Sequence, residues 1–299
     1  MSEILLDVQD LTHCFRLGRN RVLRAVDGIS FQLRKGEIFG LVGESGSGKS
    51  TAAKCIMNIL HPTAGKIRYL GINTCDPRQF RSHKKFLQIS RQIIFQDSTS
   101  SLNPRMTVAD IITEPLMIHH IWPPRGSLRA EAAFQLKCVG MDPGYLDKHP
   151  AELSGGQRQR VAIARSLGMG PELLVADEPI ASLDVSIQAQ MINLFKHLQQ
   201  EHGFTFLFIA HDLAVVRYLC DRVGVMFQGK LVETGPVGEV FSHPLHPYTQ
   251  ALLSAIPIPD PRRERKRIPQ FFDSTAFDRE GQLREVSPGH MVFQKGDKL

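Results

Sequence analysis

The stretch "GESGSGKS", Gly43 to Ser50, follows the pattern G-x-x-x-x-G-K-[ST] of phosphate-binding loops. In such a loop the backbone amides surround phosphate groups, the lysine reaches the outer phosphates and the hydroxyl residue binds magnesium. The stretch follows the apolar run "EIFGLVG" and precedes "KSTAAKCIMNIL", which has helical spacing. It therefore stands between a strand and a helix, as the chemistry requires. We expect Lys49 to neutralise the β and γ phosphates, Ser50 to hold Mg²⁺ and Thr51 to support the α phosphate.

Working outward, other apolar runs predict the sheet around this loop. "QIIFQ" is rich in β-forming residues, and "LLVAD" and "TFLFIAH" are almost continuously apolar. Strands this apolar belong in a sheet covered on both faces, which favours a parallel α/β core. "MTVADIITEPLMIHH" and "SLRAEAAFQLKCVGM" have helical character instead, separated by "WPPRG". They predict a helical subdomain at about 106–168, inserted in the nucleotide-binding core.

Composition limits the class of protein. With 299 residues and 42% hydrophobic content the chain supports a substantial core, and about 150 residues per domain suggests one large domain or two smaller ones. No apolar run approaches the roughly 18 residues of a membrane span, and "MSEILLDVQD" carries acids where a signal peptide is basic, so we expect a cytosolic protein. The net charge of +6 permits contact with an anionic membrane surface or nucleic acid but requires neither.

The five cysteines do not indicate a metal site. They are widely spaced, and none forms a C-x-x-C pair or a His/Cys cluster with ligand spacing. We interpret all five as ordinary thiols in a reducing compartment.

Polar side chains stand where three predicted strands end. In "LLVADEP", Asp177 closes the strand at the carboxyl edge of the sheet, where open α/β sheets bind ligands, and Glu178 follows it. Asp177 suits a magnesium ligand, and Glu178 suits the base that polarises an attacking water. Gln96 would complete the metal and water shell and His211 would contact the γ phosphate. A single Gln or His at a strand end is more often an ordinary polar residue, but the shared placement of these residues favours a catalytic role.

A second anion-binding feature stands at "LSGGQRQR", residues 153–160. A small hydroxyl residue and two glycines at a helix N-terminus present free N–H groups and the positive end of the helix dipole. The sequence thus raises the question of why one chain carries two phosphate sites.

The ordered set "GESGSGKST", Gln96, "LSGGQ", "LLVADEP", "SLD" and "IAHD" resembles the ATP-binding cassette (ABC) ATPases from about the N-terminus to Gly235. The resemblance implies a P-loop NTPase-type parallel sheet core, an N-terminal antiparallel β region and a helical insertion. It also implies that two cassettes close head to tail, each ATP lying between one chain's phosphate loop and the other chain's "LSGGQ" segment. Phe15 matches the aromatic residue that stacks on adenine, although it would also suit a buried strand, and Asp184 matches a loop that faces the opposite site. The implied nucleotide-binding residues are Phe15, Gly43, Glu44, Ser45, Gly46, Ser47, Gly48, Lys49, Ser50, Thr51, Ser154, Gly155, Gly156, Gln157 and Asp184; the catalytic ones are Gln96, Glu178 and His211, and the metal ligands are Ser50, Gln96 and Asp177.

Two further stretches, one of them in the C-terminal half, make the family resemblance more specific. "HPLHPYTQALLSAIP", residues 243–257, and "QDSTSSLNPRMTV" resemble ATPase subunits of bacterial dipeptide and oligopeptide importers, a group that includes some nickel importers. By itself, "HPYTQALL" indicates only a small amphipathic helix with Pro at its start. The resemblance implies ATP-driven peptide import on the cytoplasmic side of the inner membrane. The implied partners are transmembrane permease subunits, a second ATPase subunit and, indirectly, a substrate-binding protein.

Two alternatives stay open at this stage. A nickel or other small-solute importer is possible because the permease and binding protein select the substrate. A soluble ABC protein acting on ribosomes or DNA is disfavoured, because it would need two cassettes or a long coiled-coil insertion, so we expect no nucleic-acid partner. We favour a heterodimer of cassettes, since the group commonly pairs two different chains.

The chain departs from many members of this group near its C-terminus. It has no cysteine after Cys220, so we expect no iron-sulfur cluster. We expect an ABC ATPase domain at 1–255 and a basic, Pro-rich tail at 256–299. After Pro257, "PIPDPRRERKRIPQ" predicts loosely packed linker-like chain; its "RRERKR" run would suit anionic headgroups, but a solvated linker is the preferred interpretation.

Overall fold

The computed structural model describes residues 3–18, 21–96, 101–181, 183–256 and 270–295. Its chain divides into two compact units. One unit, called the helical unit below, contains Asp76–Leu207. The other, called the phosphate-loop unit, contains Glu3–Cys75 and Phe208–Leu299.

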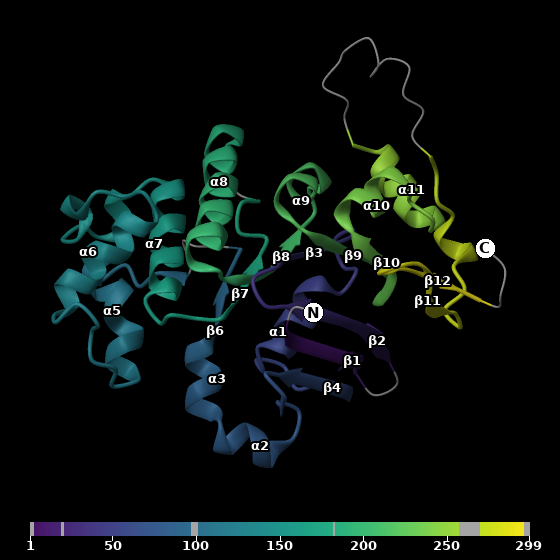
Figure 1. Ribbon diagram of the computed structural model, residues 1–299, viewed down its shortest axis with the longest axis horizontal. Helices are drawn as coiled ribbons and strands as arrows, with labels where there is room; N and C mark the ends of the chain where they lie inside the picture. The colour runs from purple at the N-terminus through teal and green to yellow at the C-terminus, as the bar shows by residue number, and fades with distance from the viewer. Residues whose placement is uncertain (1–2, 19–20, 97–100, 182, 257–269, 296–299) are drawn as a thin grey trace, which may run out of the picture. The chain divides into compact units, whose positions relative to one another are not determined.

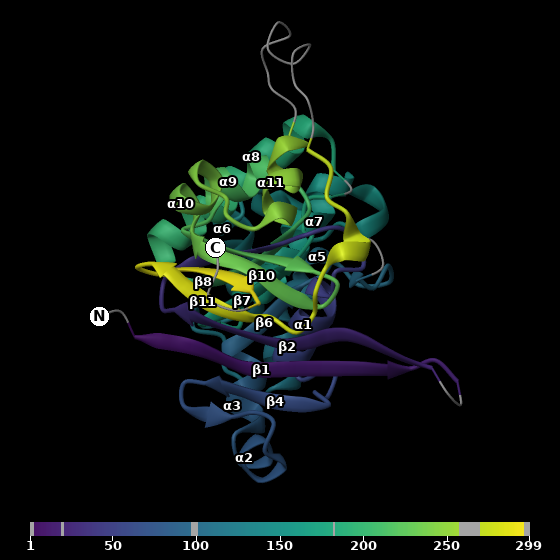
Figure 2. The same ribbon diagram turned by 90° about the vertical axis from the view of Figure 1, so that its right-hand side faces the viewer.

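The phosphate-loop unit begins with an antiparallel sheet in the order β2-β1-β4-β5, of which Figure 2 shows β2, β1 and β4 side by side. Its strands are β1 (Ile4–Arg16), β2 (Val22–Arg34), β4 (Ala64–Tyr69) and β5 (Ile72–Asn73). In the register of β1 and β2, Leu6 faces Leu33 and Val8 faces Phe31, and all four side chains are buried. The N-terminal antiparallel β region expected from the family resemblance is thereby confirmed.

Five further strands of this unit form a mixed sheet in the order β11-β12-β10-β9-β3. The strands are β3 (Ile38–Val42), β9 (Arg222–Phe227), β10 (Lys230–Pro236), β11 (Gln282–Ser287) and β12 (His290–Gln294). β3 pairs with β9 in parallel, and every residue of β3 is buried, as expected for an apolar strand covered on both faces. The other three pairs are antiparallel.

The helices of this unit pack on its two sheets. α1 (Lys49–Ile56) contacts β1 and β2, and α9 (Leu213–Leu219) contacts β3. α10 (Val237–Ser242) and α11 (Pro247–Ser254) both pack against β10. Pro247 occupies the first position of α11, where a missing N–H costs nothing.

The C-terminal tail contains two strands that the sequence did not predict. We predicted loosely packed chain after Pro257, and "RRERKR" together with the rest of 257–269 lies outside the described residues. That prediction covered residues 257–270, and no strand was predicted in residues 271–295. β11 and β12 form a hairpin, β12 pairs with β10 opposite Glu233, and Val292 and Phe293 are buried. These strands escaped prediction because they are short and follow a Pro-rich and Arg-rich stretch.

The helical unit combines a parallel strand pair with a group of helices. β6 (Arg91–Ile94) pairs in parallel with β7 (Leu173–Asp177), whose five residues are all buried. α5 (Val108–Ile118), α6 (Leu128–Cys138) and α7 (Gly155–Leu167) pack on one another, as Figure 1 shows. The remaining elements are α2 (Pro77–Ser82), α3 (Lys84–Ser90), η1 (Pro143–Tyr145), η2 (Pro150–Glu152), α8 (Val185–His202) and the start of β8 (Thr205–Ala210).

Local sequence signals explain where the helices of this group begin. Thr107 and Asp110 form a reciprocal capping box at the start of α5. The Ser127 hydroxyl accepts the N–H of Ala130 at the start of α6. The apolar faces of these helices enclose a core that includes Ile112, Leu116 and Leu136. Within the described part of the chain, no helix is both long and apolar enough to cross a membrane.

Candidate nucleotide-binding site

The phosphate loop joins β3 to α1 and depends on its glycines. Gly43, Gly46 and Gly48 have φ angles of 146°, 80° and 106°, a region that L side chains rarely adopt. A Cβ atom on Gly43 would lie 2.1 Å from the Met226 carbonyl oxygen, and one on Gly48 would lie 2.1 Å from that of Ala25. A Cβ atom on Gly46 would meet nothing within 4 Å. The loop backbone is therefore closely packed on two sides and open at Gly46.

Lys49, the first residue of α1, lies folded back into this loop. Its ammonium donates hydrogen bonds to the carbonyl oxygens of Gly43 and Glu44, both at 2.8 Å, and to the Ser47 hydroxyl at 3.3 Å. The residue is only 4% exposed. Gly48 is the N-cap residue of α1 and makes no side-chain capping hydrogen bond. A buried cation beside a helix N-terminus is suited to an anionic group such as a phosphate.

The acidic pair lies at the end of β7 in the helical unit. Asp177 is 6% exposed, and Glu178 is half-buried. Glu178 has a φ of 48°, which is uncommon for a residue other than glycine and is found often at functional sites. Gln96 follows β6, and its Nε2 donates to Glu178 Oε2 at 3.1 Å. The parallel pairing of β6 with β7 brings these two predicted catalytic residues together. From the sequence, we expected both of them at the same edge of the sheet.

The "LSGGQ" segment, Leu153–Gln157, begins α7. Ser154 is its N-cap, and the Ser154 hydroxyl accepts the Gln157 N–H at 3.3 Å while Gln157 Oε1 accepts the Ser154 N–H at 2.9 Å. Gln157 Nε2 also donates to the Tyr145 hydroxyl at 3.1 Å. A Cβ atom on Gly156 would lie 2.7 Å from Ile187 Cγ2 of α8. The helix start is thus held rigidly, with Ser154 exposed at its tip.

The other predicted residues occupy separate positions in the two units. Phe15 is half-buried in β1, where its ring lies 4.6 Å from that of His13 in an edge-on arrangement. His211 is exposed directly after β8, and Asp184 is the exposed N-cap residue of α8. Ser182 of the "SLD" motif and residues 97–100 of "QDSTSSLNPRMTV" lie outside the described residues. The phosphate-loop unit holds Phe15, Gly43–Thr51 and His211, and the helical unit holds Gln96, Ser154–Gln157, Asp177, Glu178 and Asp184.

One residue that sequence reasoning missed contacts the phosphate loop directly. Tyr248 of α11 is 2% exposed, and its hydroxyl accepts the Glu44 N–H at 3.0 Å. The available signal was a tyrosine on a short amphipathic helix. A buried tyrosine hydroxyl normally has a polar partner, but the pattern does not say which.

Each unit holds residues of the kinds that bind a nucleoside triphosphate or magnesium. The loop supplies backbone amides and a buried cation for phosphates, with open space at Gly46. Ser50, Asp177 and the amide oxygen of Gln96 are oxygen donors, which Mg²⁺ prefers. Because the Nε2–H group of Gln96 donates a hydrogen bond to Glu178, the amide oxygen of Gln96 is the atom suited to a metal.

Comparisons with known proteins identify the family of this chain. A family model described as "ABC transporter" matches residues 26–181, and one described as "Oligopeptide/dipeptide transporter, C-terminal region" matches residues 232–276. The oligopeptide transport ATP-binding protein OppF of Bacillus subtilis is 49% identical over 98% of this chain and 97% of its own length. The dipeptide transport ATP-binding protein DppF of Lactococcus lactis is 43% identical over 97% of this chain and 93% of its own length.

A solved structure is similar as well. The dimeric ATP-binding cassette MJ0796, in a post-hydrolysis state bound to ADP and Pi, has a TM-score of 0.68 and 28% identity over 78% of this chain and 98% of its own. The protein described here is therefore an ATPase of the ABC class, and the ABC ATPase fold predicted from the sequence is confirmed. More narrowly, the chain belongs to the family of oligopeptide and dipeptide transport ATP-binding proteins.

Proposed function

We propose that this chain is the ATP-hydrolysing subunit of a peptide importer, attached to the cytoplasmic face of the inner membrane through transmembrane permease subunits. The observation that carries the proposal is the match of 232–276 to the C-terminal region of oligopeptide/dipeptide transporters, on a chain whose core matches an ABC transporter. Relatives named for oligopeptide and dipeptide transport align along nearly the whole chain.

In the proposed reaction the residues of this chain have separate roles. Lys49 neutralises the outer phosphates of ATP, and the amides of Gly46 to Thr51 surround them. Phe15 stacks on the adenine, and His211 contacts the γ phosphate. Magnesium, held by Ser50, Gln96 and Asp177, would supply positive charge beside the phosphate oxygens.

Glu178 accepts a proton from the water that attacks the γ phosphate. Gln96 supports this role, because its hydrogen bond to Glu178 Oε2 helps to fix the carboxylate. The left-handed backbone of Glu178 is consistent with a position selected for function, since such conformations persist only where the surroundings enforce them.

The two anion-binding features are explained if they serve different nucleotides. The segment Leu153–Gln157, with Asp184, would face the ATP held by the phosphate loop of a second ATPase subunit. The dimeric state of the similar cassette MJ0796 supports a dimer of cassettes, and we favour two different chains. Closure of the pair would then depend on bound ATP.

Two variants test this arrangement. Glu178→Gln keeps an oxygen to accept from Gln96 but removes the basic carboxylate, so hydrolysis should fall at least about a hundredfold while ATP-dependent association is retained or strengthened. Ser154→Arg places a bulky cation at the start of α7 and should block association, while the chain's own phosphate loop still binds ATP. Size-exclusion chromatography with Mg-ATP, with the partner cassette present, separates the outcomes. Normal hydrolysis by Glu178→Gln or normal association by Ser154→Arg would refute the arrangement.

A separate experiment tests whether the transported substrate is a peptide. The purified transporter, with its permease and binding protein, should hydrolyse ATP faster when short peptides are added, and nickel ions should give no such increase. Stimulation by nickel alone would contradict the assignment to peptides. We further propose that no iron-sulfur cluster is present, because no cysteine follows Cys220.

A further inference from the structure

The hydrogen bond from Tyr248 reaches the phosphate loop at a particular peptide. Its hydroxyl accepts the N–H of Glu44, which belongs to the peptide unit that joins Gly43 to Glu44. The carbonyl oxygen of that same unit, on Gly43, accepts a hydrogen bond from Lys49 Nζ at 2.8 Å. A peptide unit is planar and rigid, so its N–H and C=O turn together. The Tyr248 hydroxyl and the Lys49 ammonium thus hold one peptide from opposite ends.

Close ring contacts hold the Tyr248 side chain in place. Its ring centroid lies 4.4 Å from that of Phe227, at the end of β9, and 5.5 Å from that of Phe272. Phe227 and Phe272 also contact each other edge to face at 5.2 Å. Because Phe272 lies in the segment between α11 and the C-terminal hairpin, the tail contributes directly to the position of this tyrosine.

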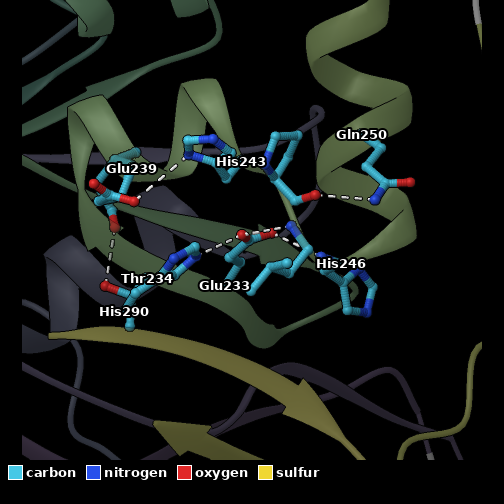
Figure 3. A network of polar contacts seen from close by, with 10 residues as sticks. Glu233, Thr234, Glu239, His243, His246, Gln250 and His290 are labelled. Carbon is cyan, nitrogen blue, oxygen red and sulfur yellow. Dashed lines mark hydrogen bonds and ion pairs between the residues drawn. The ribbon is translucent and has the colours of Figure 1, made fainter. Parts of the chain in front are cut away.

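Buried polar groups hold the turn before α11, and Figure 3 shows Glu233, His246 and His290 among them. His246 caps α11, and its Nδ1 accepts the Tyr248 N–H at 3.1 Å. Glu233 of β10, with no exposed surface, accepts the N–H groups of Leu245 and His246 at 2.9 and 3.0 Å. His290 of β12 lies 2.8 Å from Glu233 through its Nε2 and is itself 2% exposed. The C-terminal hairpin, β10 and α11 are therefore connected by hydrogen bonds.

The protonation states support this description. Burial raises the pKa of Tyr248 to about 12, so its oxygen remains a neutral hydroxyl near pH 7. Burial lowers the pKa of His246 to about 4, despite the nearby Glu233 carboxylate, so its imidazole is neutral and Nδ1 has a lone pair for the Tyr248 N–H.

We propose that Tyr248 is a positioning residue for ATP binding. It orients the Gly43–Glu44 peptide and, through the Gly43 carbonyl, the ammonium of Lys49. The C-terminal region found in oligopeptide/dipeptide transporters thereby supports the nucleotide site as part of its framework. This inference rests on the proposed function, in which Lys49 binds the outer phosphates.

The test compares Tyr248→Phe with Tyr218→Phe, a matched control in α9, whose tyrosine is 56% exposed. The first variant keeps the ring contacts and deletes only the hydroxyl. Its affinity for a fluorescent ATP analogue should fall about three- to tenfold, the range expected for one lost hydrogen bond. Tyr218→Phe should bind like wild type. The KM for ATP should rise with the loss of affinity, while kcat at saturating ATP changes less than twofold, because the reacting groups are untouched.

A double-mutant cycle with Lys49→Ala tests the route of the effect. If Tyr248 acts through the ammonium, its hydroxyl should have no influence on ATP affinity once Lys49 is absent. A second variant, Glu44→Pro, removes the N–H donor of the same hydrogen bond, should weaken binding to a similar extent and keeps the proposal testable if Tyr248→Phe does not fold.

The outcomes separate this inference from the proposed function. Wild-type ATP binding by Lys49→Ala would refute the phosphate-loop assignment itself. If Lys49→Ala loses affinity as expected but Tyr248→Phe and Glu44→Pro both bind normally, the positioning role of Tyr248 is overturned. An equal effect of Tyr248→Phe with and without Lys49 would also overturn it, since the hydroxyl would then act by another route.

Discussion

Mild acid should destabilise the phosphate-loop unit through His246. This side chain is 6% exposed, and its Nδ1 accepts the backbone N–H of Tyr248 at the start of α11. Burial lowers its pKa from 6.5 to about 4, although Glu233 favours the charged form. Protonation of Nδ1 would remove the acceptor and place a charge in the core.

The sign and the size follow from proton linkage. Between about pH 6.5 and pH 4 the unfolded chain binds a proton that the folded chain does not, so stability falls as the pH falls. A pKa difference of about 2.5 units corresponds to roughly 3 kcal/mol once the pH is below about 4. At pH 5 the same relation gives about 2 kcal/mol, and the contribution is fully present above about pH 6.5.

The matched variant is His246→Asn, because asparagine is a good helix N-cap residue that does not titrate. Urea unfolding followed by circular dichroism would give the free energy of unfolding of both proteins from pH 7.5 to pH 4.5. The other titrating groups are common to both, so the difference between them isolates His246. We expect wild type to lose about 2 kcal/mol relative to the variant by pH 5. A difference that stays constant within about 0.5 kcal/mol across this range would refute the assignment of a neutral, buried capping imidazole.

Two shorter predictions concern the nucleotide and the cysteines. Lys49→Ala should abolish hydrolysis and weaken ATP binding, because the phosphates lose a buried counter-charge; equilibrium binding and turnover at wild-type levels would contradict this. Anaerobically purified protein should contain no stoichiometric iron or sulfide, which elemental analysis measures directly, and a stoichiometric content of both would show that the cysteines do hold a cluster.

The sequence predicted those parts of the fold in which one short segment determines its own structure. "GESGSGKS" between an apolar strand and a helical pattern is sufficient to predict the phosphate loop, because the positive φ angles of Gly43, Gly46 and Gly48 are a local requirement of the turn. "LLVAD" was recognised as a buried strand for the same reason, and the contact between Gln96 and Glu178 follows from two parallel strands ending together.

The parts that were missed depend on distant partners. The hairpin of β11 and β12 is stable because β12 pairs with β10, which precedes it by more than fifty residues, and neither strand has a long alternating pattern of its own. The role of Tyr248 depends on a hydrogen bond to Glu44, 204 positions away in the chain. A pattern within "HPYTQALL" indicates a helix but contains no information about that partner.

The central claim is that this chain converts ATP hydrolysis into peptide import. The most direct measurement is uptake of a labelled oligopeptide into proteoliposomes that contain the permease and both cassettes, with ATP on the side of the cassettes and the binding protein on the other. We predict accumulation of peptide that requires ATP, is lost when this chain carries Glu178→Gln and is retained with Tyr218→Phe. Equal accumulation with the Glu178→Gln chain, or accumulation of nickel and not of peptide, would contradict the account.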